Sequence, residues 1–112
     1  MAYCKSICGK LAEPTRKKEK NKLKKLAKSV TIQGLGVWIG VNRPYQDESF
    51  TYASNGKSLE YKDWFPGEPN KQYPAEACVT MKKSYGFEWN DTRCSKKMSF
   101  VCERVENCPG TT

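Results

Sequence analysis

Hydrophobic positions near the start of the chain recur at the spacing of an α-helix. Tyr3, Ile7 and Leu11 lie at every fourth position, which places them on one helical face. We therefore expect a helix over residues 4–12. Pro14 interrupts the pattern, because proline has no backbone N–H to donate inside a helix.

A second helical pattern follows, over residues of about 15–29. Thr15 suits the N-cap position, where its hydroxyl oxygen can accept a backbone N–H. The apolar residues of the segment form one predicted stripe, and they are Leu23, Leu26, Ala27 and Val30. Lysine fills most other positions, so we expect a basic helix with one apolar face.

The hydrophobic pattern changes after Leu35, from the helical repeat to short continuous runs. Residues 37–41, Val-Trp-Ile-Gly-Val, are almost wholly apolar and predict a buried strand. Strand character returns in three later segments, at 77–81, 86–89 and 99–103.

The segment between the first and second predicted strands is long and irregular. Residues 42–76 are rich in Asn, Pro, Gly, Asp and Ser, with isolated aromatic residues among them. A loop of this length inside a compact domain is uncommon and usually has a function. We therefore expect functional residues in this loop.

The size of the chain limits its organisation. Its 112 residues suffice for a single domain, 1–112, with one core and a short tail at 104–112. No apolar run approaches the roughly 20 residues that span a bilayer. The opening residues MAYCKSICGK lack the apolar stretch and cleavage site of a secretory signal.

Six cysteines in so short a chain indicate disulfide bonds formed in an oxidising compartment. A zinc site is the weaker alternative, because histidine is absent and no CxxC pair occurs; Cys4 and Cys8 are the closest pair. We therefore expect a secreted protein, and we expect the sequence to be a mature domain or a piece of a longer chain.

The positive charge is concentrated in the second predicted helix. The formal net charge is +8, and Arg16 to Lys28 holds eight basic residues and one acidic residue. The rest of the chain is close to neutral, so the positive charge is a property of this helix and not of the whole domain.

Oxygen-bearing side chains gather in the long loop and after it. They are Glu68, Asn70, Glu76, Asn90 and Asp91. Carboxylate and amide oxygens suit a hard cation, and calcium accepts roughly 6–8 oxygens in a flexible geometry, whereas magnesium needs a tighter octahedron. The donors therefore predict a calcium site.

Pro69 lies between two of these donors and has a mechanical interpretation. A cis Glu68–Pro69 bond would turn the chain sharply, so that the flanking side chains or a backbone carbonyl converge on one ion. The cis form costs only about 0.5–1 kcal/mol before proline and much more elsewhere. We expect this bond to be cis.

Five linked motifs occur along the chain in a distinctive order and spacing. They are Trp38-Ile39-Gly40, Gly67-Glu68-Pro69-Asn70 after Trp64, Glu76-x-Cys78-Val79, Trp89-Asn90-Asp91 before Cys94, and Phe100-Val101-Cys102-Glu103. Together they resemble the C-type lectin domain over about Ala2 to Glu103, nearly the whole chain. The resemblance implies an α+β fold with two helices, small antiparallel sheets and a long calcium-binding loop, and no enzymatic activity.

The resemblance implies a shared role for the five oxygen donors. In that family they hold one calcium ion, and a sugar binds the ion through two vicinal hydroxyls. The same side chains, Glu68, Asn70, Glu76, Asn90 and Asp91, also hydrogen-bond those hydroxyls. The order Glu-Pro-Asn marks equatorial 3- and 4-hydroxyls, as in mannose, N-acetylglucosamine and fucose; the Gln-Pro-Asp of galactose binders is absent.

Some positions depart from the family pattern. The acids of an auxiliary calcium site in some relatives match Lys71 and Ala77, so we expect that site to be lost. Lys71 could lean over the sugar or stay solvated, and Tyr73 could stack on a sugar ring or pack within the loop. Residues 90–92 match a glycosylation sequon, but a glycan on a calcium ligand would block the site, so we take the match as incidental.

The resemblance also implies the disulfide pairing. The expected bridges are Cys4–Cys102, Cys78–Cys94 and an additional Cys8–Cys108. Because Cys4 and Cys8 lie one helical turn apart, an exchange of their partners is an open alternative. The family's first strand, which precedes the first helix, has no counterpart, which indicates truncation or an unpaired edge at 99–103.

The predicted function is calcium-dependent binding of mannose-type glycans on glycoproteins or microbial surfaces, with an oligomer providing avidity. Three alternatives stay open. Glu68 and Glu76 could be a glycosidase acid–base pair, although carboxylates beside amides favour a metal site. The basic helix could bind polyanions or be a solvated face. The domain could also bind protein, with calcium only structural.

Overall fold

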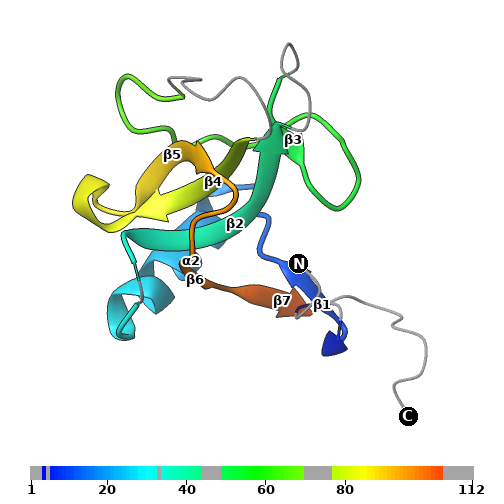
Figure 1. Ribbon diagram of the computed structural model, residues 1–112. Coiled ribbons are helices and arrows are strands. Elements are labelled where there is room, and N and C mark those ends of the chain that lie inside the picture. Colours follow the sequence, from blue (N-terminus) through cyan, green and yellow to red (C-terminus); the bar gives the residue numbers. More distant parts are fainter. Residues whose placement is uncertain (1–3, 5, 33, 44–48, 70–76, 105–112) are drawn as a thin grey trace.

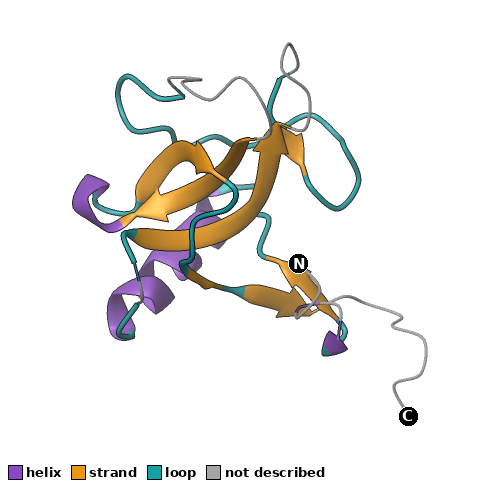
Figure 2. Cartoon of the chain, in the orientation of Figure 1, coloured by secondary structure: helices purple, strands orange, loops and turns teal. Residues whose placement is uncertain are grey.

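One α-helix packs on a small central β-sheet, and a two-stranded sheet lies beside them (Figure 1). The computed structural model describes residues 4, 6–32, 34–43, 49–69 and 77–104. Figure 2 shows the helix below the central sheet and the irregular segments above it. The architecture is α+β, as the sequence predicted.

The central sheet is built around strand β2, Gly36–Arg43. Along one edge, β2 pairs antiparallel with β4 (Ala77–Lys82), and β4 pairs antiparallel with β5 (Glu88–Arg93). Along its other edge, β2 pairs with β3 (Thr51–Tyr52) at one end and in parallel with β6 (Ser99–Phe100) at the other.

Strands occur at all four predicted segments, but their bounds differ. The segment 99–103 is divided between β6 and a second strand, Cys102–Arg104, in the two-stranded sheet. A short 3-10 helix, η1 (Lys83–Tyr85), precedes β5, and Gly86 and Phe87 have φ of 62° and 64°. Such left-handed backbone cannot continue a strand, so β5 begins at Glu88 and not at Gly86. Strand β3 lies inside the segment that we predicted to be loop.

The core lies between the central sheet and the helix. Its side chains come from the inward-facing positions of the strands, where alternate residues point to one side. The largest fully buried one is Trp89, and the cluster around it includes Val37, Ile39, Val41, Val79 and Met81. The helix contributes Ala27, which is 2% exposed.

Helix α2 spans Lys17–Ser29, close to the predicted 15–29. The predicted N-cap is wrong, because Arg16 occupies that position and no side chain caps it. Thr15 acts as a donor: its N–H and Oγ1 lie 2.7 and 2.8 Å from Oε1 of Glu19. Both hydrogen bonds lower the pKa of Glu19, and the one from the backbone N–H of Thr15 has the larger effect.

The predicted apolar stripe of α2 is only half correct. Ala27 is buried and Leu23 packs against the core, but Leu26 and Val30 are exposed. The buried face includes Lys20, so the helix is rotated away from the orientation that the leucine spacing predicted. In the parts of the chain that the structure describes, no helix is long and apolar enough to cross a bilayer.

The predicted helix over 4–12 is wrong in its second half. Cys4 and Ser6 are helical, but Cys8 has φ of 63°, which ends the helical turn. Strand β1 (Gly9–Leu11) follows and pairs antiparallel with β7 (Cys102–Arg104). The alternative of an unpaired edge at 99–103 is therefore wrong for residues 102–104, which pair with β1. Ile7 is 55% exposed, so the helical spacing did not mark a core face.

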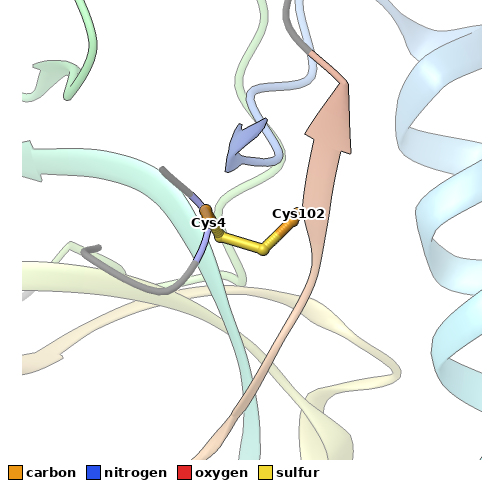
Figure 3. The surroundings of a disulfide bond; sticks show 2 residues. All are labelled: Cys4 and Cys102. Carbon is orange, nitrogen blue, oxygen red and sulfur yellow. A yellow bond between two sulfur atoms is a disulfide. The ribbon is translucent and has the colours of Figure 1, made fainter. Parts of the chain in front are cut away.

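Two predicted disulfides are confirmed. Cys4 is bonded to Cys102, joining the start of the chain to β7 (Figure 3). The second bond joins Cys78 in β4 to Cys94, just after β5. Cys8 is also disulfide-bonded. Its predicted partner, Cys108, lies outside the described residues, so the Cys8–Cys108 pairing stays a prediction.

Glu13 fastens the start of the chain to the long loop. Its carboxylate is buried and accepts hydrogen bonds from the N–H and Oγ of Ser54 at 2.9 and 2.8 Å. Lys10 Nζ lies 3.0 Å from the same carboxylate. Burial alone would lower the pKa of Lys10, but the carboxylates of Glu13 and Glu103 raise it. Burial raises the pKa of Glu103.

Candidate calcium and carbohydrate site

A polar pocket contains three of the five predicted donors. Glu68, Asn90 and Asp91 line one hollow of about 250 Å³. Glu68 comes from the long loop and the other two come from β5, so the fold brings together segments that are distant in sequence. The remaining two donors, Asn70 and Glu76, lie outside the described residues, as do the accessory candidates Lys71 and Tyr73.

Backbone pairing places the loop against β5. Phe65 N–H donates to the carbonyl of Trp89 at 3.0 Å, and Trp89 N–H donates to the carbonyl of Asp63 at 2.9 Å. Glu68 N–H then donates to the carbonyl of Phe65 at 2.8 Å, which turns the chain back towards the pocket. The Glu68–Pro69 bond is cis, as predicted.

Asn90 is held in place by two hydrogen bonds. Its Oδ1 accepts from Oγ1 of Thr80 at 2.5 Å, and its Nδ2 donates to the carbonyl of Asp91 at 3.3 Å. Thr80 lies directly opposite Asn90 in the β4–β5 register. An amide oxygen has two lone pairs, so Oδ1 can accept from Thr80 and still bind a cation. The sequence analysis missed Thr80, because its place opposite Asn90 follows from the register of β4 on β5 and not from a motif.

Asp91 is the most buried of the described donors, with 3% of its surface exposed. Burial of a carboxylate is costly unless a cation or several hydrogen bonds compensate for it. Lys82 and Lys96 line the same pocket, so its described charged side chains are two carboxylates and two ammonium groups.

The donor chemistry fits a calcium ion. Glu68 and Asp91 offer carboxylate oxygens and Asn90 offers an amide oxygen, all of them hard ligands. No cluster of three or more His, Cys, Asp or Glu residues occurs within the described ranges. The described part of the pocket therefore provides two carboxylates and one amide towards the roughly 6–8 oxygens that calcium accepts.

An aromatic wall borders the pocket. Tyr85 lines it and stacks on Phe65, with ring centroids 3.8 Å apart and planes 13° from parallel. Lys82 Nζ lies 4.4 Å from the centre of the Tyr85 ring, a cation–π distance. Sequence reasoning missed this wall, because no motif relates Tyr85 to the loop aromatic on which it stacks.

Comparisons with known proteins agree with the fold. The chain matches the family model "Lectin C-type domain" over residues 1–104. It is 33% identical over 109 residues to salivary C-type lectin 2 of Aedes albopictus, covering 91% of this chain and 72% of that protein. It is 32% identical over 103 residues to the galactose-specific lectin nattectin of Thalassophryne nattereri, covering 92% of this chain and 64% of that protein.

A solved structure gives the same result. The carbohydrate-recognition domain of cow CD23, crystallised in the presence of a GlcNAc2Man3 oligosaccharide, has a TM-score of 0.76 and 30% identity, covering 96% of this chain and 78% of that chain. Some relatives are much longer, since the chain spans only 29% of bovine collectin-11. With a family model covering most of its length and relatives of this similarity, the chain belongs to the C-type lectin domain family.

Proposed function

We propose that this domain binds calcium and, through the ion, mannose-type carbohydrate. The observation that carries the proposal is the convergence of Glu68, Asn90 and Asp91 on one polar pocket. Asn70 and Glu76 would complete the set. The disulfides and the salivary relative support secretion as the setting.

The division of work in the site follows from the chemistry of sugars. A sugar hydroxyl must give up water to bind, so its hydrogen bonds alone yield little net free energy. A bound calcium ion supplies vacant coordination positions for two vicinal hydroxyls. The carboxylates accept hydrogen bonds from those hydroxyls and the amides donate to them, so the arrangement of acid and amide reads the stereochemistry.

The order Glu68-Pro69-Asn70 supports mannose-type rather than galactose-type sugars. Nattectin, at 32% identity, is galactose-specific by name, so the proposal of mannose-type sugars rests on this motif and not on overall similarity. Binding of a single sugar should be weak, so glycans on glycoproteins or microbial surfaces would be held by several sites in an oligomer.

The proposal is tested by calorimetry on the oxidised protein. Calcium should give a saturable heat, mannose should bind only with calcium present, and galactose should bind more weakly. Glu68→Gln should abolish mannose binding, because it removes a charge from the ion site while keeping the side-chain size. Glu60→Gln changes an exposed carboxylate elsewhere and should have no effect.

Other outcomes would contradict the proposal. No heat on adding calcium, or mannose binding that survives a chelator, would exclude the ion-mediated mechanism. A flat response to calcium and to a full set of glycans would favour a protein-binding domain of the same fold. Steady hydrolysis of a glycan would favour the glycosidase alternative.

A further inference from the structure

We propose that the outer face of α2 binds sulfated polysaccharide, independently of calcium. Five lysines of the helix are exposed, and we call them the lysine face: Lys17, Lys18, Lys22, Lys25 and Lys28. Helix α2 lies below the central sheet (Figure 1), and it is distant in sequence from the loop donors.

The fold sorts the basic residues of the helix into two groups. Lys20 and Lys24 point towards Asp63, with Nζ 3.9 and 3.4 Å from its Oδ2. Their side chains are 10% and 19% exposed, so these two ammonium groups are paired within the protein and do not belong to its outer surface. The lysine face is what remains, and no ion pair is found for its members within the described residues.

The lysine face is arranged as a continuous stripe. Lys18, Lys22 and Lys25 follow the i, i+4, i+7 spacing of one helical face, and a rise of about 1.5 Å per residue makes this row about 10 Å long. A shallow groove along it is lined by Lys17, Lys18, Asn21, Lys22 and Lys25, with no acidic residue. The acidic residue of the helix, Glu19, is engaged with Thr15.

A row of like charges destabilises the free protein by electrostatic repulsion, and a bound polyanion would remove that repulsion. Lysines at i and i+4 repel each other along a helix. A multiply charged ligand would replace this repulsion with attraction and release the bound counterions. Lysine suits such a ligand, because its ammonium is a mobile point charge rather than a planar fork.

The surroundings of the lysine face favour polysaccharide over two other polyanions. An interfacial helix inserts an apolar face into a membrane. Here Leu23 and Ala27 are used by the core and Leu26 is the one exposed apolar residue of the helix. Single-stranded nucleic acid binds on aromatic platforms, and α2 contains no aromatic residue. Sulfate groups on a flexible sugar chain need neither feature.

The experiment measures binding of heparin, as the sulfated probe, to the oxidised protein in excess chelator. Lys18→Gln, Lys22→Gln and Lys25→Gln are combined in one variant, which keeps helix propensity because lysine and glutamine are similar. We expect heparin binding to weaken by at least about tenfold, and the slope of log affinity against log salt to fall by about two to three.

A matched variant removes the same charge elsewhere. Lys57, Lys83 and Lys97 are exposed and lie outside α2, and their combined change to Gln should weaken binding only slightly. Equal losses in the two variants would show an effect of net charge alone and overturn the proposal. Calcium and mannose titrations of both variants show whether the fold and the separate loop site are intact.

Two comparisons test the choice of ligand. Anionic phospholipid vesicles or single-stranded DNA that bound more tightly than heparin at equal salt would overturn the assignment to sulfated polysaccharide. Heparin binding that required calcium would indicate that heparin binds at the loop pocket, which would overturn the proposal. Desulfated heparin should bind at least about tenfold more weakly than heparin, since each lost sulfate removes an ionic contact.

Discussion

The loop pocket and the lysine face differ in charge and in structural support: the described lining of the pocket has two carboxylates and two ammonium groups, whereas the lysine face is wholly basic. The pocket holds carboxylates from two distant segments, and Asp91 is buried on a strand of the central sheet. The lysine face is a single helix with exposed side chains. The pocket therefore depends on tertiary structure, whereas the lysine face needs little more than α2 itself, and the two can be perturbed separately.

Removing the disulfide that joins β4 to the residue after β5 should have the largest effect on stability. Cys78 and Cys94 are 16 residues apart, and the stretch between them contains Asn90 and Asp91. Replacing both cysteines by alanine should lower the free energy of unfolding by about 3 kcal/mol, measured by urea denaturation. Calcium affinity should fall as well, but heparin binding in native buffer should not. Unchanged calcium affinity would show that the pocket does not depend on this bridge.

Removing the buried charge should affect the pocket alone. Loss of a residue that only orients a metal ligand typically costs 10–100-fold in affinity, so Asp91→Asn, at a proposed direct ligand, should weaken calcium binding by about a hundredfold or more. Isothermal calorimetry measures the change, with Glu60→Gln as the control. A loss below about threefold would exclude Asp91 from the calcium ligands, because a direct ligand contributes more than an orienting residue.

Asp63→Asn should change the helix and the sheet moderately. It removes the charged partner of Lys20 and Lys24, and the expected loss of stability is about 1 kcal/mol, since asparagine keeps a side-chain oxygen that can accept hydrogen bonds from the two lysines. The two released lysines should tighten heparin binding slightly. A double-mutant cycle with Lys24→Gln in urea denaturation isolates the pair. An additive cycle would mean that this ion pair contributes nothing.

Glu19→Gln should have the smallest effect, and the effect should depend on pH. The folded pKa of Glu19 lies below its unfolded value, so its contribution is present above the unfolded pKa and is lost as pH falls through the folded pKa. Because the side chain is 40% exposed, we expect no more than about 0.5 kcal/mol near pH 7. Thermal unfolding of both proteins at several pH values measures it. A constant difference down to pH 2 would contradict the ionic origin.

The fold was predictable where one local signal dominated. The apolar run at 37–41 marked β2, and the lysine-rich repeat marked α2. The first helix was misjudged because three apolar residues at helical spacing gave no information about the backbone at Cys8, whose positive φ ends the turn. The rotation of α2 was missed for a similar reason: the pairing of Asp63 with Lys20 and Lys24 is a tertiary contact.

The sequence identified donor residues that lie together in the structure, but it did not identify the contacts that support them. Glu68, Asn90 and Asp91 were found from donor chemistry and from motifs, and the structure places them on one pocket. The hydrogen bond from Thr80 and the stack of Tyr85 on Phe65 depend on strand register and on the path of the loop. A sequence without its pairing partners does not specify either.

The Cys4–Cys102 bridge has a consequence for how a cleaved molecule would be detected. It closes a ring across a sequence separation of 98. A protease that cut once within that ring would leave the two fragments covalently tethered, with an unchanged mobility until the sample is reduced. A nicked molecule would therefore pass for an intact one on a non-reducing gel.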